Sequence, residues 1–217
     1  MSKAAVLWTG GKDSALSLFK AMNEGYIIDR LITFVPPNPT FLAHPLSIVQ
    51  EQAKALQVPH YLVEIVAPFD KSYENAISKL KEEGIDTLIT GDIAEVEGAP
   101  NWIRERSKPS GMQVYTPLWY ENREEIIEEL ISLNFEVIFS CVKKTKLTTD
   151  WLGRKIAKDT LAEMKKLSSK NGLDICGENG EYHTLVLNCP LFSSPVILKK
   201  SWNVGEKGDL VYMNFEQ

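Results

Sequence analysis

The stretch Thr9-Gly10-Gly11-Lys12-Asp13-Ser14, TGGKDS in one-letter code, decides the fold of this chain. Residues 4–7 before it form an apolar run that predicts a buried strand, and residues 14–24 after it have the apolar spacing of a helix. In an open α/β sheet, ligands bind beyond the carboxyl ends of the strands, where a helix amino terminus offers unpaired amides and a partial positive charge to an anion. The two glycines let the backbone approach phosphate oxygens, and the Thr9 and Ser14 hydroxyls add hydrogen-bond donors. The junction therefore predicts a phosphate-binding loop, which we call the phosphate loop (residues 9–14).

The two charged residues of the phosphate loop suit polyphosphate chemistry. Lys12 can neutralise phosphate charge, and the Asp13 carboxylate can hold Mg²⁺. The loop differs from a Walker A loop, because Asp13 follows Lys12 where that motif has Ser or Thr, and it also differs from the GxGxxG dinucleotide fingerprint. The alternative is a plain glycine turn with Asp13 or Ser14 as the helix cap. Two hydroxyls, a lysine and an aspartate at one strand-to-helix junction favour phosphate binding over that alternative.

The first half of the chain predicts an α/β domain. Up to residue 116, β-rich runs alternate with segments of helical period, which is typical of crossover units around a parallel sheet. We expect parallel strands over residues 4–7, 27–35, 61–66, 85–90 and 113–115, and helices over residues 14–24, 46–56 and 73–83.

The second half predicts a smaller α+β domain. Pro117 breaks the preceding pattern, and an acidic segment over residues 123–133 has one apolar helical face. Strands are expected over residues 135–142, 184–187 and 196–199, and a helix around residues 161–167. The sequence thus predicts two domains, over residues 1–118 and 119–217, and both sizes are usual for domains.

Composition narrows the functional class. The chain has 217 residues with 24 Lys and Arg against 29 Asp and Glu, and this net charge of −5 argues against a surface built to hold nucleic-acid phosphates. Residues 31–50 are uncharged and long enough to cross a bilayer, but several prolines interrupt them, so a membrane span is not expected. The apolar run at the amino terminus is too short for a secretory signal, and we expect a cytoplasmic protein. Cys141, Cys176 and Cys189 lie far apart without a CxxC pair, which favours reduced core residues over disulfides or a zinc site.

A second unusual stretch reads Gly177-Glu178-Asn179-Gly180-Glu181-Tyr182-His183-Thr184. Asn-Gly is a strong signal for a two-residue hairpin, and a surface hairpin without a function is one interpretation. In such a hairpin Glu178 and Glu181 would stand opposite each other, where like charges are destabilising. A cation between them would remove that cost. We therefore interpret the two carboxylates as a site for ammonium, a quaternary ammonium or a metal ion.

The phosphate loop resembles the SGGxDS loop of the N-type ATP pyrophosphatases, with Thr9 in place of the first Ser. Together with GDI at residues 91–93, PLW at residues 117–119, DWLGR at residues 150–154 and GENGEYHT at residues 177–184, it makes nearly the whole chain similar to the diphthine–ammonia ligase family of these enzymes. The resemblance implies a five-stranded adenine nucleotide alpha hydrolase-like domain followed by a smaller substrate-binding domain. It implies amidation of diphthine on elongation factor 2 with ATP, Mg²⁺ and ammonium, through an acyl adenylate and with release of AMP and pyrophosphate. The oligomeric state stays open, a homodimer included.

The resemblance also implies roles for individual residues. The phosphate loop would hold the pyrophosphate part of ATP, with Lys12 and Asp13 in catalytic roles and Asp13 as the ligand of Mg²⁺. Gly91 and Asp92 would contact the nucleotide, although Asp92 is equally explained as a helix cap. The remaining assignments concern the second substrate. Glu178 and Glu181 would bind ammonium or the trimethylammonium of diphthine, His183 would accept a proton, and Trp119, Trp151 or Tyr182 would offer an aromatic face to the same cation unless they are core residues.

Two departures from the family pattern bear on that substrate. Relatives read GEGGE followed by an aromatic residue and Glu, whereas here Asn179 replaces a glycine and His183 replaces that Glu. Where relatives carry a Tyr, Gln and Arg cluster, residues 94–106 have only Arg104 and Arg106 as basic residues. Two alternatives are therefore kept: an adenylating ligase for another carboxylate, and a nucleotide-binding regulator without activity. Sulfur transfer is disfavoured because the cysteines form no reactive pair.

Two further residues have two interpretations each. Arg154 either holds a carboxylate or phosphate or is an exposed helix residue. His44 either covers the nucleotide or is a solvated loop residue in its Pro-rich connection.

Overall fold

The computed structural model of the protein describes residues 3–95, 98–198 and 201–215. The chain forms two compact units. The first unit comprises Met1–Thr9, Asp13–Pro39 and Gln57–Tyr120, and the second unit comprises Gly10–Lys12, Thr40–Leu56 and Glu121–Gln217. The middle of the phosphate loop therefore belongs with the carboxyl-terminal half of the chain. The expected domain limits at residues 118 and 119 remain a proposal.

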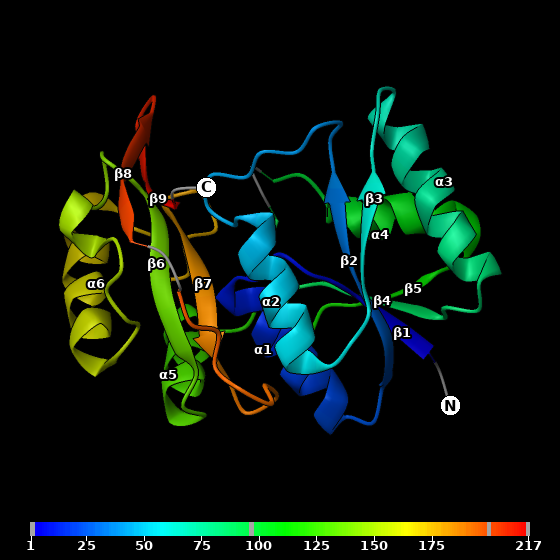
Figure 1. Ribbon diagram of the computed structural model, residues 1–217, viewed down its shortest axis with the longest axis horizontal. Coiled ribbons are helices and arrows are strands. Elements are labelled where there is room, and N and C mark those ends of the chain that lie inside the picture. The colour runs from blue at the N-terminus through cyan, green and yellow to red at the C-terminus, as the bar shows by residue number, and fades with distance from the viewer. Residues whose placement is uncertain (1–2, 96–97, 199–200, 216–217) are drawn as a thin grey trace. The chain divides into compact units, whose positions relative to one another are not determined.

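The first unit is built on a five-stranded sheet in the order β3-β2-β1-β4-β5. Its strands are β1 (Lys3–Leu7), β2 (Ile27–Val35), β3 (His60–Glu64), β4 (Thr87–Ile89) and β5 (Gln113–Tyr115). Every neighbouring pair is parallel, and in Figure 1 the arrows of β2 and β3 point the same way. In the register, Val6 of the central strand pairs with Leu31 on one side and with Ile89 on the other. The expected five-stranded parallel sheet is confirmed.

The strand order places the topological switch point of this sheet between β1 and β4. The chain runs outward from β1 through β2 to β3, and then returns to the other side of β1. A crevice beyond the carboxyl ends of the strands at such a point is the usual ligand site of open α/β sheets. We call the edge of this sheet at the carboxyl ends of its strands the ligand edge; the phosphate loop begins there, at Thr9 after β1.

Helices cover this sheet because its central strand is apolar on both faces. Ala4, Ala5 and Val6 of β1 are fully buried, as expected for a strand of a parallel sheet. Residues of β1, β2, β4, α3 (Phe69–Glu82) and α4 (Trp102–Ser107) share one apolar cluster, so α3 and α4 lie on the same face of the sheet (Figure 1). The cluster contains Ala5, Ile32, Ile77, Leu80, Ile85, Leu88 and Met112, with Leu7, Phe34, Val63 and Ile103 packed against it.

Helix limits in the first unit differ from the expected ones in two places. Helix α1 (Lys12–Asn23) lies close to its expected range, but α3 begins at Phe69, directly after Pro68, four residues before the expected start. Helix α4 was not expected from the sequence. It begins where the Asn101 side chain accepts a hydrogen bond from the Arg104 amide at 2.9 Å, which is an N-cap contact.

The second unit contains a four-stranded antiparallel sheet in the order β7-β6-β9-β8. Its strands are β6 (Glu136–Lys143), β7 (Tyr182–Asn188), β8 (Trp202–Lys207) and β9 (Leu210–Phe215), and its helices are α2 (Leu46–Leu56), α5 (Arg123–Ser132) and α6 (Lys158–Asn171). Helix α5 has an N-cap at Asn122 and buries Ile126, Ile127 and Leu130 on the expected apolar face. The expected smaller α+β architecture is confirmed.

The expected strand over residues 196–199 is wrong for its described residues 196–198, and Lys199 lies outside the described residues. Val196 makes one backbone hydrogen bond, to the Leu187 carbonyl at 2.7 Å, and no ladder follows in this segment. The strands of this region are β8 and β9, which pair with each other and turn at Gly208, where φ is +62°. The signal that could have predicted them is a turn glycine between two β-rich segments, the alternating run Trp202-Asn203-Val204 before it and the apolar run Leu210–Met213 after it.

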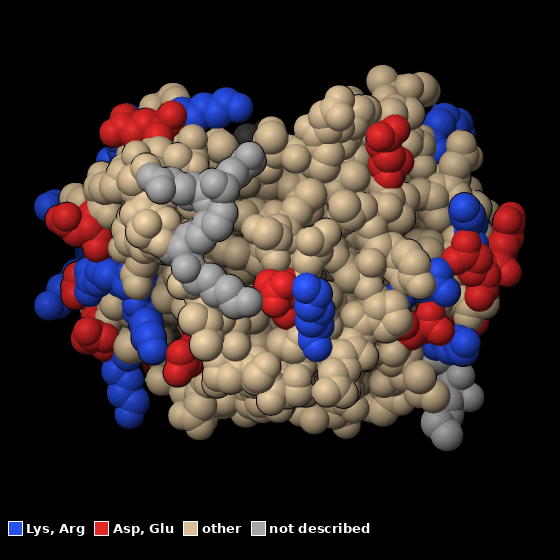
Figure 2. All heavy atoms as spheres, in the orientation of Figure 1, with Lys and Arg blue, Asp and Glu red and all other residues tan. Residues whose placement is uncertain are grey.

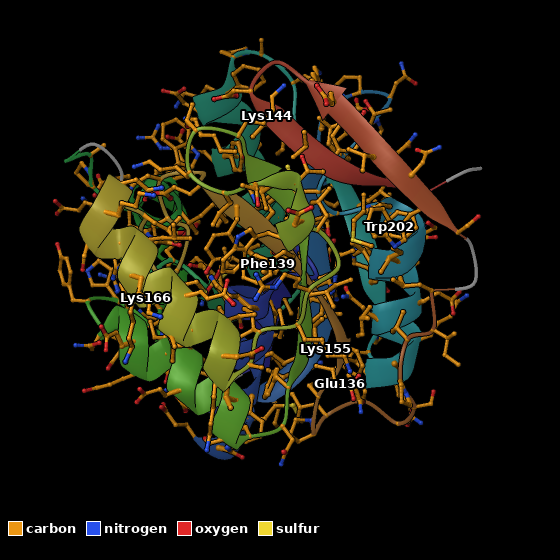
Figure 3. All side chains as sticks on the ribbon, turned by 90° about the vertical axis from the view of Figure 1, so that its left-hand side faces the viewer. Glu136, Phe139, Lys144, Lys155, Lys166 and Trp202 are labelled. Atoms are coloured by element: carbon orange, nitrogen blue, oxygen red, sulfur yellow. The ribbon has the colours of Figure 1, made fainter. Side chains whose placement is uncertain are left out.

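The interior of the second unit is centred on Phe139 of β6. Its ring makes edge contacts with Trp151 and Tyr182 at centroid distances of 5.0 and 4.9 Å. Figure 3 shows Phe139 enclosed within the unit, whereas Glu136 and Lys155 lie together at its surface, where their side chains pair at 3.3 Å. The three cysteines are buried and form no disulfide, and burial raises the pKa of Cys141 and of Cys189 to about 11.

Charge and hydropathy of the structure agree with the composition. Basic and acidic side chains are interspersed on the face that Figure 2 shows. Among residues 3–95, 98–198 and 201–215, no helix combines the length and the apolar character that crossing a membrane requires.

Candidate functional site

The phosphate loop follows β1 at the ligand edge, and its two hydroxyls lie together. Thr9 Oγ1 and Ser14 Oγ are 3.2 Å apart, within hydrogen-bond distance. Thr9 is exposed, Asp13 is half-buried and Ser14 is buried. Since α1 begins at Lys12, the first amides of the helix belong to the loop itself, which is the arrangement that binds anions at helix amino termini.

Gly91 allows the end of β4 to approach this loop closely. A Cβ atom at this position would lie 2.7 Å from both the Asp13 carbonyl carbon and the Ser14 nitrogen, closer than side-chain atoms approach a backbone. Only glycine fits between β4 and the phosphate loop without moving one of them. The predicted site residues Asp13, Ser14 and Gly91 are therefore brought together by the fold.

Asp92 lies in a polar cluster directly after Gly91. The Thr90 hydroxyl and the Asn101 amide, the latter at 2.6 Å, both donate to Asp92 Oδ2. Asn101 in turn caps α4, so the carboxylate is linked to the start of that helix. Asp92 is not itself the N-cap of α4, and its fixed position at the ligand edge suits the predicted nucleotide contact.

Arg104 is a site candidate that sequence reasoning treated only as one of two basic residues. Its guanidinium lies over the Trp119 ring, 5.0 Å from the centroid, and its Nη2 donates to the Thr116 hydroxyl. Thr116 and Trp119 follow β5, so these residues belong to the same ligand edge as the phosphate loop. The sequence did carry a signal for Arg104. Asn101 is an N-cap residue by type and predicts the start of a helix, which would place Arg104 in the first turn.

The middle of the phosphate loop is hydrogen-bonded to β7 within the second unit. The Gly10 carbonyl accepts from the Val186 amide at 3.0 Å and from Gln52 Nε2 at 2.9 Å, and the same Nε2 donates to the Val186 carbonyl at 2.8 Å. The Lys12 amide donates to the Thr184 hydroxyl at 3.1 Å. Gly10 has φ of +80°, and a Cβ there would meet Gln52 Oε1 at 2.3 Å, so a glycine is required. Gln52 was not predicted as a site residue.

The Lys12 side chain is buried beside the second unusual stretch. Only 2% of Lys12 is exposed, and its Nζ donates to the Cys176 carbonyl at 2.6 Å. The ammonium also lies 5.4 Å from the centroid of the Tyr182 ring, in cation–π range. Lys12 therefore connects the middle of the phosphate loop to the loop around residues 176–182. Its role in neutralising phosphate charge stays a prediction.

The hairpin expected at Asn179 and Gly180 is wrong. Strand β7 begins at Tyr182 and pairs with β6, so Glu178 and Glu181 are not cross-strand neighbours of a two-residue hairpin. Glu181 is 2% exposed, and its carboxylate accepts from the Asp174 amide at 3.1 Å, from the Asn179 amide at 2.9 Å and from Asn179 Nδ2 at 3.3 Å. These bonds stabilise the loop and supply a reason for a carboxylate at this position that requires no bound cation. A ligand role for Glu178 and Glu181 stays a prediction.

His183 forms a pair with His44 inside the second unit. The ring centroids are 5.5 Å apart in an edge arrangement. Burial first, and then repulsion from His183, lower the pKa of His44 to about 3, against a hydrogen bond with the Thr184 backbone that raises it. His44 is therefore neutral at pH 7 and lies against the predicted proton acceptor. The burial of His44 argues against a solvated loop residue, and a contact with the nucleotide stays a prediction.

Trp151 and Arg154 are engaged with other side chains. Arg154 lies over the Trp151 ring, 4.3 Å from its centroid, and forms two hydrogen bonds with Glu163 at 3.0 and 2.6 Å. The Glu163 carboxylate raises the pKa of the Arg154 guanidinium. Arg154 is half-buried and lies outside any helix, so its interpretation as an exposed helix residue is wrong; its partner Glu163 lies on α6, and Trp151 is a buried packing residue.

The side chains at the phosphate loop fit a magnesium site only if phosphate oxygens of the substrate and waters supply the remaining ligands. Within residues 3–95, 98–198 and 201–215, no three His, Cys, Asp or Glu side chains come together as a metal cluster. Mg²⁺ in nucleotide enzymes is usually held by one or two carboxylates together with phosphate oxygens and waters. Asp13, half-buried at the start of α1, is a donor of that kind.

Comparison with known proteins assigns both parts of the chain. The family model described as the diphthamide synthase N-terminal domain matches residues 2–114, and the one described as the diphthamide synthase C-terminal domain matches residues 122–208. Diphthine–ammonia ligase of Rattus norvegicus is 28% identical over 239 residues, covering 95% of this chain and 86% of the relative. Diphthine–ammonia ligase of Schizosaccharomyces pombe is 33% identical over 90% of this chain, which corresponds to 36% of the longer relative.

A solved structure supports the architecture. It is a predicted subunit of tRNA methyltransferase from Methanocaldococcus jannaschii, with 18% sequence identity and a TM-score of 0.50 over 88% of this chain and 98% of that one. At this identity the likeness concerns the fold alone. With both family models matched in order, and with the phosphate loop at the switch point, the chain belongs to the diphthamide synthase family of enzymes, whose matched relatives are ligases.

Proposed function

We propose that this protein is a diphthine–ammonia ligase that converts the carboxylate of diphthine on elongation factor 2 into an amide, using ATP and ammonium. The observation that carries the proposal is the match of both diphthamide synthase domains to a chain whose TGGKDS loop lies at the switch point of a parallel sheet. The proposal includes action in the cytoplasm on a protein substrate. It includes no nucleic-acid or membrane partner, and it leaves monomer and homodimer open.

The first step is adenylation. A carboxylate oxygen of the substrate attacks the α-phosphorus of ATP, the bond to the bridging oxygen breaks, and pyrophosphate leaves. The amides at the start of α1 and the Thr9 and Ser14 hydroxyls would hold the leaving pyrophosphate, and Asp13 would hold the Mg²⁺ that neutralises its charge. Gly91 and Asp92 would contact the nucleotide at the opposite side of the switch point.

The second step is amide formation. Ammonia attacks the acyl carbon, the bond from that carbon to the phosphate oxygen breaks, and AMP leaves while the new amide loses a proton. A base must also take a proton from ammonium, since only ammonia carries the attacking lone pair. His183 is the proposed acceptor, and Glu178 and Glu181 are the proposed carboxylates for the ammonium or for the trimethylammonium of diphthine.

One observation supports a second candidate function. Asn179 and His183 depart from the glycine and the Glu of the family pattern described above; Asn179 lies in the loop before β7 and His183 at the start of β7, the segment proposed to meet the second substrate. An adenylating ligase for a different carboxylate would have the same phosphate loop and a changed loop here. Lys12 links the two loops in either case.

The test is incubation with ATP, Mg²⁺, ammonium and diphthine-bearing elongation factor 2, with AMP and the substrate mass followed together. We expect AMP and the carboxamide to appear in equal amounts and only when all components are present. AMP with a different carboxylate would support the second candidate, and nucleotide binding without pyrophosphate release would indicate a regulator. Asp13→Asn should lower AMP formation at least about 100-fold. The exposed Asp150→Asn should leave it unchanged.

A further inference from the structure

Arg104 differs from every other arginine of the chain in what surrounds its charge. Arg30, Arg106, Arg123 and Arg154 each pair with at least one carboxylate. Among the residues that the structure describes, the Arg104 guanidinium has no carboxylate partner within ion-pair distance, and its described hydrogen bond goes to the Thr116 hydroxyl. A guanidinium has five N–H donors in a planar fork, and the hydrogen bond to Thr116 uses only one of the two terminal nitrogens of this fork.

The guanidinium is held in place before any ligand binds. The Trp119 ring lies under its plane at 5.0 Å, and the Thr116 hydroxyl accepts from Nη2. Both contacts come from the segment that follows β5, while Arg104 itself lies in the first turns of α4. A fixed, stacked arginine loses less conformational entropy on binding a carboxylate than a free one does.

A centre of opposite charge lies beside it. The Tyr120 hydroxyl is hydrogen-bonded to the Glu95 side chain, which raises the pKa of Tyr120. Tyr120 is 65% exposed, and its ring lies 5.1 Å from the Trp119 ring. The quaternary cation expected at Trp119 would have to share that ring with Arg104, whereas Tyr120 offers an open face and a nearby carboxylate.

The backbone at Tyr120 is also unusual. Its φ is +62°, a value that residues with a side chain seldom adopt, and its amide donates to the Ile93 carbonyl at 2.7 Å. Such strained positions are found preferentially where a side chain must be presented to a ligand. The segment after β5 is thus tied to the segment after β4, which carries Asp92.

We infer that Arg104, Tyr120 and Glu95 form a binding site for a zwitterion that joins a carboxylate to a quaternary ammonium. Arg104 takes the carboxylate, and the Tyr120 ring with the Glu95 carboxylate takes the cation. This inference rests on the proposed function and deepens it, because diphthine carries both groups and its carboxylate is the one to be adenylated. The site lies at the edge where the phosphate loop lies, within the first unit.

The test uses small probes and no turnover, so that it stands apart from the test of the ligase activity. Glycine betaine, which joins a trimethylammonium to a carboxylate, is titrated into the full-length protein beside acetate and choline. The readouts are binding by calorimetry and the Nε–H resonance of Arg104, assigned by its disappearance in Arg104→Lys. We expect betaine to shift this resonance and to bind at least ten-fold more tightly than either half-molecule.

Variants identify the groups that bind each half. Arg104→Ala should weaken betaine binding at least ten-fold, and Glu95→Gln should weaken betaine while leaving acetate within two-fold. Arg106→Ala is the matched control, since Arg106 lies on the same helix and over Trp102 at 4.9 Å but already pairs with Glu74 and Asp70. It should leave betaine binding within two-fold, and circular dichroism should show all variants folded.

Several results would overturn the inference. These are an unmoved Arg104 resonance, equal affinity for betaine and acetate, or unchanged betaine affinity in Arg104→Ala. Loss of affinity for a non-hydrolysable ATP analogue in Arg104→Ala with betaine binding intact would instead make Arg104 a phosphate ligand and would equally overturn it. If betaine binds as expected and no AMP forms with diphthine, the proposed function fails while the site stands.

Discussion

Replacing Gln52 tests whether the phosphate loop is held by the hydrogen bonds seen in the second unit. The side chain is fully buried on α2, and its Nε2 joins the Gly10 carbonyl to the Val186 carbonyl. Leucine has a similar volume and no donor, so Gln52→Leu removes both bonds without a large cavity. At about 1 kcal/mol for each buried hydrogen bond, the loss of unfolding free energy should be about 2 kcal/mol.

The Gly10 carbonyl keeps its bond from the Val186 amide, which limits the loss at that end. For a chain of this size, about 2 kcal/mol corresponds to a fall in Tm of roughly 4–8 °C. Urea and thermal unfolding measure these quantities, and calorimetry with a non-hydrolysable ATP analogue measures whether nucleotide affinity falls with them. Gln50→Leu is the control, since Gln50 is exposed on the same helix. A loss no larger than that of the control would refute the reasoning.

Three further predictions concern the glycine at β4, the buried carboxylate and the histidine pair. Gly91→Ala should lower the unfolding free energy by about 1–3 kcal/mol, because its Cβ meets the Asp13 backbone at 2.7 Å, and a measured loss below a few tenths would contradict this close approach. Glu181→Gln should cost about 2 kcal/mol, since one of the two oxygens that accept from the loop amides becomes an NH2 group that cannot accept, and an unchanged urea midpoint would argue for a purely catalytic role. The pKa of His44 is lowered to about 3 in the folded chain, so as the pH drops the unfolded chain binds a proton at this residue first. The free energy of unfolding should therefore fall as the pH drops through about 6.5, the pKa of His44 in the unfolded chain. His44→Gln should therefore show a smaller loss of urea midpoint between pH 7.5 and pH 5.5 than the natural chain does, and equal losses would exclude this linkage.

Local signals predicted the first unit well. TGGKDS between an apolar run and a helical segment was enough to place the phosphate loop, because glycines, hydroxyls and a helix start act within a few residues of each other. The five-stranded sheet followed from alternating periods, which reflect burial on both faces of β1 and its neighbours. Helix α4 was missed because six residues carry little periodicity, although Asn101 is an N-cap residue by type.

Local sequence signals do not predict contacts between residues that are far apart in the chain. Lys12 and Cys176 are 164 positions apart, and nothing near either residue indicates that an ammonium meets a backbone carbonyl. Glu181 was interpreted by its charge, whereas the structure uses the carboxylate to bind the amides of its own loop. Gln52 did carry a signal, since it lies four residues after Ile48 and three after Val49 on the apolar face of α2. A polar residue on the apolar face of a helix indicates a side chain that is buried and hydrogen-bonded.

The attachment of Gly10–Lys12 to β7 has a consequence for dissecting the protein. A truncated chain ending at residue 120 would keep the parallel sheet, the hydroxyls of Thr9 and Ser14 and the carboxylate of Asp13, but would lose Val186, Thr184 and Cys176, which anchor the centre of the loop. Cutting the chain at residue 120 would therefore separate Gly10–Lys12 from the hydrogen-bond partners that hold these three residues within the second unit.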